Sequence, residues 1–134
     1  MSVNSTGANE TAATQFINTL ISGGVNVLLI GGGTSVSYTD AGTDISGYST
    51  SSVSVGETAL TISTPADFTG TADLSNDNQL DFGSVDIGVV DDVVIQNQNT
   101  TDLFVLADET NNPDTTGEQV TLPAGTTLYS LGNA

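Results

Sequence analysis

The second half of the chain consists of short runs of β-branched and aliphatic residues. Four such runs lie within 85–131, at 89–96, 103–107, 119–122 and 126–131. Clusters of Asn, Gly and Pro separate the runs. Short apolar runs bounded by turn-forming residues are typical of antiparallel strands. We therefore predict an antiparallel meander over this half of the chain.

Two of these runs predict which face each residue occupies. In 89–96, a period of two places Val93 and Ile95 on one face and Val94 on the other, together with Asp92 and Gln96. The run 103–106 (LFVL) is apolar on both faces. A strand of that kind is expected at the centre of a sheet, with both faces covered.

The first half begins with a helical pattern. One apolar stripe recurs at the spacing of a helix, at Ala13, Phe16, Ile17, Leu20 and Ile21. Asn9 is suited to the N-cap, Glu10 favours the first turn, and Gly23 with Gly24 supplies a stop. We predict a helix over 10–22.

The segments after the helix predict further strands. The run 25–30 (VNVLLI) is expected to be buried on both faces, 34–38 is a candidate strand, and one or two strands within 53–62 are broken near Gly56. The remaining assignments are a polar loop at 40–52, an edge strand at 68–72 and a loop at 73–79. The chain is thus predicted to be mainly β: a small antiparallel β-sandwich or barrel with one N-terminal helix. An arm over 1–8 precedes a single β-domain over 9–134.

The net charge of the chain indicates the surroundings in which it folds. The chain has sixteen Asp and Glu and no Lys, Arg or His, for a net charge of −16. Such a chain repels itself when compact, and salt of about 1 M relieves this because the Debye length falls to ~3 Å. The hydrophobic fraction of 37% argues against disorder. We predict a folded protein adapted to salty surroundings; an acidic domain from ordinary surroundings is the alternative.

The composition also limits partners and compartment. Without Lys or Arg, neither nucleic acid nor an anionic membrane surface is an expected partner. Cysteine is absent, so disulfides and thiolate metal sites are excluded. No apolar stretch approaches the ~20 residues of a membrane span. The start, MSVNSTGANE, lacks the pattern of a secretory signal, and we expect a protein that is cytoplasmic when made or is released by lysis.

Catalysis has few groups to use in this chain. Ser-His-Asp, Cys-His and P-loop arrangements need residue types that are missing. A glycosidase with two carboxylates stays open, although neighbouring acids such as Asp91 and Asp92 point to opposite faces of a strand, as do Asp108 and Glu109. Asp81 and Asp86 converge only if the fold brings them together. We expect no enzymatic activity and no required cofactor.

Divalent cations are the remaining chemical candidate. An oxygen-rich segment at 73–81 offers Asp73, Asp77 and Asp81 as ligands for Ca²⁺ or Mg²⁺, with Asn76 and Asn78 between them. A second oxygen-rich segment spans 108–114. Neither has the spacing of an EF-hand, so solvated turns held by Asn and Asp are the alternative.

Two further motifs have simple explanations. The sequence GGGTS at 31–35 follows a predicted strand but lacks the Lys and the helix of a phosphate loop, and we interpret it as a sharp turn. Sequons occur at Asn4, Asn9 and Asn99, and Asn99 in a predicted hairpin turn is the best candidate for glycosylation.

Several motifs occur in a recognisable order. The chain opens with TQFINTLISGGVNVLLIGGGTS, continues with TDISGYSTSSVSV and LSNDNQLDFGSV, and ends with VVIQNQNTTDLFVLAD and VTLPAGTTLYSL. This order resembles tail-fibre-like or minor structural virion proteins of tailed bacteriophages, over most of 10–131. The chain departs from that family at 31–33, where the family has His-Thr-Gly-Asp-Pro, and lacks the Arg after the loop Tyr. The resemblance implies a structural role and carries over no site residues.

These observations predict a function in assembly. Sheet edges without Lys, together with Tyr38, Tyr48 and Tyr129, favour self-association as a symmetric homo-oligomer. The alternative for the three tyrosines is a place at the rim of the core. We expect a structural protein on the surface of a halophilic tailed virus, contacting the major capsid or tail proteins. It would be a capsid decoration or turret, or a tail-fibre or baseplate component that aids host attachment. The alternative is a cell-surface or carbohydrate-binding module of a halophile.

Overall fold

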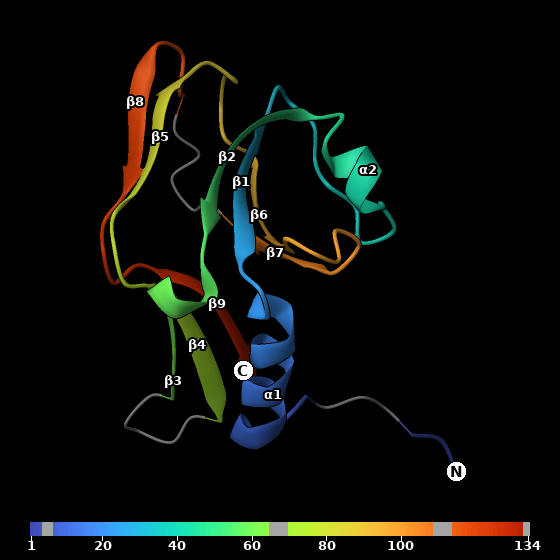
Figure 1. The fold of residues 1–134 in the computed structure, drawn as a ribbon. Helices are drawn as coiled ribbons and strands as arrows, with labels where there is room; N and C mark the ends of the chain where they lie inside the picture. Colours follow the sequence, from blue (N-terminus) through green and yellow to red (C-terminus); the bar gives the residue numbers. More distant parts are fainter. Residues whose placement is uncertain (4–6, 65–69, 109–113, 133–134) are drawn as a thin grey trace.

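Three antiparallel sheets and one long helix make up the described part of the chain (Figure 1). The structure is a computed structural model that describes residues 1–3, 7–64, 70–108 and 114–132. The elements are α1 (Glu10–Ile21), β1 (Val25–Gly31), α2 (Gly42–Ile45), β2 (Ser49–Val55), the 3₁₀ turn η1 (Glu57–Ala59), β3 (Leu60–Ser63), β4 (Thr71–Asn76), β5 (Leu80–Val85), β6 (Asp92–Asn97), β7 (Phe104–Asp108), β8 (Glu118–Leu122) and β9 (Thr127–Gly132). The sheets have the orders β2-β1-β6-β7, β3-β4-β9 and β5-β8. The predicted mainly β class is confirmed.

The helix α1 lies where the apolar stripe predicts it. Its N-cap is Asn9, whose Oδ1 accepts a hydrogen bond from the Ala12 amide at 3.0 Å. The Gly24 amide bonds to the Ile21 carbonyl at 2.8 Å, and Gly23 has a φ of 81°, so the two glycines end the helix as expected. Four residues of the stripe are buried, namely Ala13, Ile17, Leu20 and Ile21. Phe16, the fifth residue of the stripe, is 37% exposed.

The four-stranded sheet is covered on both faces. Val27, Leu29, Val93 and Ile95 face the main core, which α1 and the other two sheets complete. Leu28, Ile30 and Val94 face a second, smaller cluster under the segment 32–48. The predictions that 25–30 is buried on both faces and that 93–95 alternates are confirmed. Burying each Ile or Leu contributes about 1.5–3 kcal/mol.

The prediction of a central strand at 103–107 is wrong, because β7 lies at the edge of its sheet. A tight turn joins β6 to β7, and β1 already occupies the other side of β6, so β7 falls outside. Both faces of β7 are apolar because each face packs on a different core cluster. Val105 faces the main core while Phe104 and Leu106 pack on the smaller cluster.

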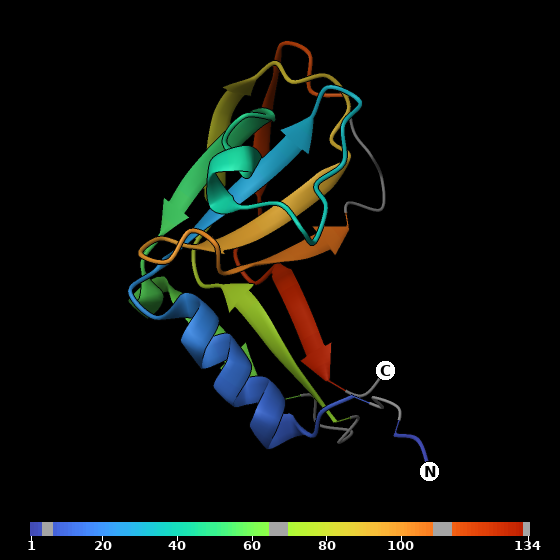
Figure 2. The same ribbon diagram turned by 90° about the vertical axis from the view of Figure 1, so that its right-hand side faces the viewer.

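The C-terminal strands do not continue as a meander. β8 pairs with β5, and β9 pairs with β4. The four strands therefore form one long two-stranded ribbon, bent between its β4–β9 half and its β5–β8 half (Figure 1). In both views the β5–β8 half lies over the four-stranded sheet and the β4–β9 half lies over α1 (Figure 2). This arrangement is a bent sandwich, and its sheets do not close into a barrel.

Four of the predicted loops and strands differ from the structure. The segment 34–38 is not a strand, because the amides of Gly33 and Val36 bond to aspartate side chains instead of a neighbouring strand. The predicted loop at 40–52 contains α2 and the start of β2. The predicted loop at 73–79 contains most of β4. Of the predicted edge strand at 68–72, residues 68–69 lie outside the described ones, and 71–72 begin β4, which is the middle strand of its sheet and not an edge.

Candidate functional site

The three predicted cation ligands lie on separate parts of the bent ribbon. Asp73 is on β4 and accepts a hydrogen bond from the Ser130 hydroxyl. Asp77 follows β4 and accepts one from the Thr61 hydroxyl. Asp81 is on β5 and accepts the Gly83 amide at 2.8 Å. Across the residues that the structure describes, no three acidic side chains come together as a metal-binding group. The cation site stays a prediction, with each of its ligands engaged locally.

Asn76 lies between these aspartates and has a different role. It is 1% exposed, and its Nδ2 donates to the carbonyls of Asn78 and Pro123 at 2.8 and 2.9 Å. Its backbone carbonyl accepts the Gly125 amide at 2.7 Å. These bonds tie the end of β4 to the turn between β8 and β9, where the ribbon bends. Asn76 is therefore a structural residue at the centre of the oxygen-rich segment.

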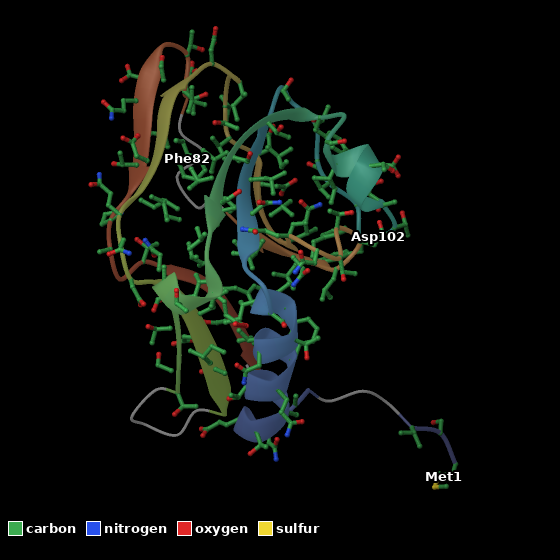
Figure 3. The ribbon with its side chains drawn as sticks, in the orientation of Figure 1. Met1, Phe82 and Asp102 are labelled. Atoms are coloured by element: carbon green, nitrogen blue, oxygen red, sulfur yellow. The ribbon has the colours of Figure 1, made fainter. Side chains whose placement is uncertain are left out.

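Aspartates anchor the segment 32–48 over the four-stranded sheet. Asp91 accepts the Gly33 amide at 3.1 Å and Asp92 accepts the Val36 amide at 3.0 Å. Asp102 accepts the Gly42 amide at 2.7 Å, and Figure 3 shows Asp102 beside α2. Adjacent acids thus serve different amides rather than converging on a substrate. A carboxylate that accepts a backbone amide makes a charge-assisted bond, which is stronger than a neutral one.

A carboxylate and a phenol complete this anchor. Asp40 accepts the Ser37 amide at 2.8 Å and the Tyr48 hydroxyl at 2.7 Å. The Ser37 bond, followed by the Tyr48 bond, lowers the pKa of Asp40. The same hydrogen bond to Asp40, followed by burial, raises the pKa of Tyr48. Tyr48 packs on the smaller core cluster, so the pair fastens the loop to the sheet.

The other two tyrosines differ in exposure. Tyr38 is 83% exposed. Tyr129 packs against the main core, and burial, followed by the charge of Tyr38, raises its pKa. Of the three tyrosines predicted to favour an interface, Tyr38 is therefore the one whose ring is free to reach a partner.

Carboxamides take the place of cations at the helix C-terminus. Asn97, 3% exposed, donates from Nδ2 to the carbonyls of Leu20 and Ser22 at 2.8 and 2.9 Å. Its Oδ1 accepts the amides of Asn99 and Thr100 at 2.9 and 2.7 Å. The last carbonyls of a helix ordinarily attract Lys, Arg or His. This chain has none, and Asn97 ties α1 to the β6–β7 turn.

The structural roles of Asn97, Asn76 and the Asp40–Tyr48 pair were not predicted from the sequence. A signal for Asn97 does exist, because a helix without a cation in its last turn needs another donor. The sequence NQN at 97–99 follows a buried strand and offers one. Partner residues for Asn76 and Asp40 are set by the fold.

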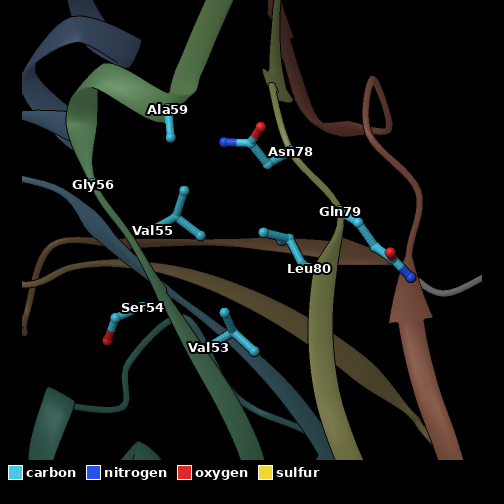
Figure 4. Close-up of a pocket in the computed structure, with 8 residues that line it drawn as sticks. All are labelled: Val53, Ser54, Val55, Gly56, Ala59, Asn78, Gln79 and Leu80. Atoms are coloured by element: carbon cyan, nitrogen blue, oxygen red, sulfur yellow. The ribbon is translucent and has the colours of Figure 1, made fainter.

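A shallow pocket of about 210 Å³ opens between the end of β2 and the start of β5 (Figure 4). Its eight lining residues carry no charge: Val53, Ser54, Val55, Gly56, Ala59, Asn78, Gln79 and Leu80. The side chains of Val53, Val55 and Leu80 point into it. A pocket lined in this way offers shape and apolar contact, with no acid or base at its walls.

The glycine run and the sequons have defined positions. Gly31 ends β1 so close to another segment that a Cβ there would lie 2.3 Å from the Ile87 carbonyl oxygen. Close backbone approach therefore explains the first glycine. Asn99 is exposed in the β6–β7 turn, as predicted, and its Nδ2 lies against Gly23. Asn9 is the cap of α1, and Asn4 lies outside the described residues.

Comparisons with known proteins give no match among family models, curated proteins or solved structures. Among the described residues, no helix is long and apolar enough to cross a membrane.

Proposed function

We propose that this chain is a non-enzymatic structural subunit on the surface of a virus particle. It works as a capsid decoration or turret, or as a tail-fibre or baseplate component, of a tailed virus that infects a salt-loving host. It is made in the host cytoplasm, assembles as a symmetric homo-oligomer, and contacts the major capsid or tail proteins. The order of sequence motifs supports the viral assignment.

The observation that carries the proposal is the use of the acidic side chains. Aspartates at both ends of the four-stranded sheet hold loops by accepting backbone amides, as Asp91, Asp92 and Asp102 do. Carboxylates used as loop anchors stabilise a surface and leave no paired acids for hydrolysis at those positions. Such surfaces suit a structural protein that packs against other subunits of a particle.

Salt supports the same proposal. A net charge of −16 on 134 residues favours dispersed copies in dilute buffer. Molar salt reduces the range of this repulsion to ~3 Å, so that uncharged surfaces of two copies can meet. The proposal therefore includes an oligomer that depends on salt.

Two measurements test the proposal. The first is light scattering after size exclusion in molar KCl, where we expect a discrete oligomer. The second is mass spectrometry of purified particles of the virus that carries this gene, where we expect the chain in fixed proportion to the major capsid protein. A monomer that is absent from particles would overturn the proposal and favour a cell-surface or carbohydrate-binding module.

A further inference from the structure

β2 is an exposed edge strand of unusual regularity. It is the outermost strand of the order β2-β1-β6-β7, and Figure 2 shows it along the margin of that sheet. All seven residues, Ser49–Val55, pair with β1 in one continuous register. Its outer edge therefore presents a row of backbone groups over seven residues.

Edge strands ordinarily carry a guard against pairing with another chain, such as a charge, a proline, a bulge or a short length. The other outer strands that the structure describes have such guards. β5–β8 and β4–β9 contain register shifts, and β3 and β7 are short, with four and five residues. β2 reads STSSVSV and has none of them.

The net charge of the chain indicates which partner can pair with the outer edge of β2. Two copies of a chain with a net charge of −16 repel each other over most of their surfaces. A contact between copies is least opposed where the backbone can pair without bringing carboxylates together. β2 has no charged side chain, and the pocket beside its C-terminal half is also lined by uncharged residues (Figure 4).

We propose that β2 pairs antiparallel with β2 of a second copy across a two-fold axis. The two four-stranded sheets then join into one continuous sheet through the two β2 strands. This inference rests on the proposed function as an assembling subunit and specifies the surface through which copies meet. It is an isologous contact, the type that closes a dimer.

Symmetry and strand length together select the register. A two-fold axis normal to the sheet keeps each side chain on its own face, so residues opposite each other must share a face. Ser52 is the middle of the strand, and the register centred on Ser52 pairs the whole of β2. In that register Ser52 lies opposite Ser52 of the second copy, and Thr50 lies opposite Ser54 of the second copy.

Single cysteines test this register without interference, because the chain contains none. In a β2–β2 pair the two Cα atoms at Ser52 lie about 4.5–5.5 Å apart, within the reach of a disulfide. At Ser54 the two Cα atoms are offset by four residues, about 13 Å along the strand, beyond that reach. S52C, S54C and a mixture of T50C with S54C are each treated in molar KCl with a thiol oxidant and, in parallel, with a short bismaleimide.

We expect S52C to form covalent dimers, S54C alone to form few, and the mixture of T50C and S54C to form dimers again. An oligomer by light scattering in which S52C, S54C and the mixture all fail to form covalent dimers would overturn β2 pairing and leave the proposed function standing. More dimers from S54C than from S52C would overturn the register centred on Ser52. A protein that stays monomeric in molar salt would overturn both. Far-UV circular dichroism of each variant checks that positions 50, 52 and 54 tolerate the cysteine.

Discussion

The helix C-terminus depends on one buried carboxamide, and replacing it is the sharpest test of how this chain manages without cations. Asn97 donates two hydrogen bonds to carbonyls of α1 and accepts two from the following turn. A net hydrogen bond contributes about 0.5–1.5 kcal/mol, and a buried carbonyl left without a partner costs more. The turn amides of Asn99 and Thr100 recover water, because both residues are exposed. We therefore expect N97A to lower the free energy of unfolding by about 2–4 kcal/mol.

The substitution N97D separates hydrogen bonding from side-chain volume. It keeps the shape but places a carboxylate oxygen where Nδ2 now lies, 2.8 and 2.9 Å from two carbonyl oxygens. Burial and those carbonyls raise the pKa of the introduced carboxyl above that in the unfolded chain. Its protonated form can donate one of the lost bonds, so the deficit is smallest below the unfolded pKa of ~3.9 and grows as pH rises through the folded pKa.

The assay is urea unfolding in molar KCl, followed by circular dichroism, across a range of pH. N99D is the matched control, because it adds the same charge to an exposed position of the same turn and should change stability by less than about 0.5 kcal/mol. At neutral pH we expect the order of stability to be N99D, then N97A, then N97D. Equal losses in N97D and N99D would refute the role assigned to the Asn97 amide.

Three further predictions concern the loop, its anchor and the cation segment. G42A should lose about 1–3 kcal/mol in urea unfolding, because its Cβ would lie 2.6 Å from the Thr101 carbonyl oxygen, whereas G56A, with nothing within 4 Å, should not. D40N should lower the pKa of Tyr48 toward 10.0, measured by phenolate absorbance in a chain whose other tyrosines are Phe; an unchanged pKa would contradict the hydrogen bond. Because that pKa is raised, the Tyr48 contribution to stability is present below pH 10.0 and is lost as pH rises through the folded pKa. Replacing the three aspartates of 73–81 by Asn should abolish any rise in Tm caused by Ca²⁺ in molar KCl if this segment binds the cation; a rise that stays unchanged would contradict the cation site.

Local patterns predicted the elements whose burial is set by their own sequence. The stripe that includes Ile17 and Leu20 predicted α1, and the apolar run at 25–30 predicted β1, because both segments bury the same faces whatever their neighbours are. The N-cap at Asn9 is equally local, as the side chain bonds an amide three residues away.

Pairing over long distances could not be predicted in the same way. β4 was assigned to a loop because Asp73 and Asn76 favour turns, although Ala72 and Leu74 alternate with them as in a strand. The choice of β9 and β5 as partners of β4 and β8 depends on the bend at Asn76, which a linear pattern does not record. The sequence therefore predicted the class of fold and not its strand order.

In the candidate site, too, some features could be predicted from the sequence and others are set by the fold. Composition predicted that acids would lack cationic partners, and aspartates such as Asp40, Asp73 and Asp91 bond to amides and hydroxyls instead. Which amide each one meets is set by the fold: Asp102 reaches Gly42, sixty residues away along the chain.

The central claim is that screening by salt allows a chain without basic side chains to fold and assemble. Its most direct test is circular dichroism with light scattering as KCl is lowered from about 1 M to 0.01 M, over which the Debye length grows from ~3 to ~30 Å. The account predicts loss of the β-sheet signal and of the oligomer on dilution, and recovery when salt is restored. A signal and an oligomer that stay unchanged at low salt would contradict it.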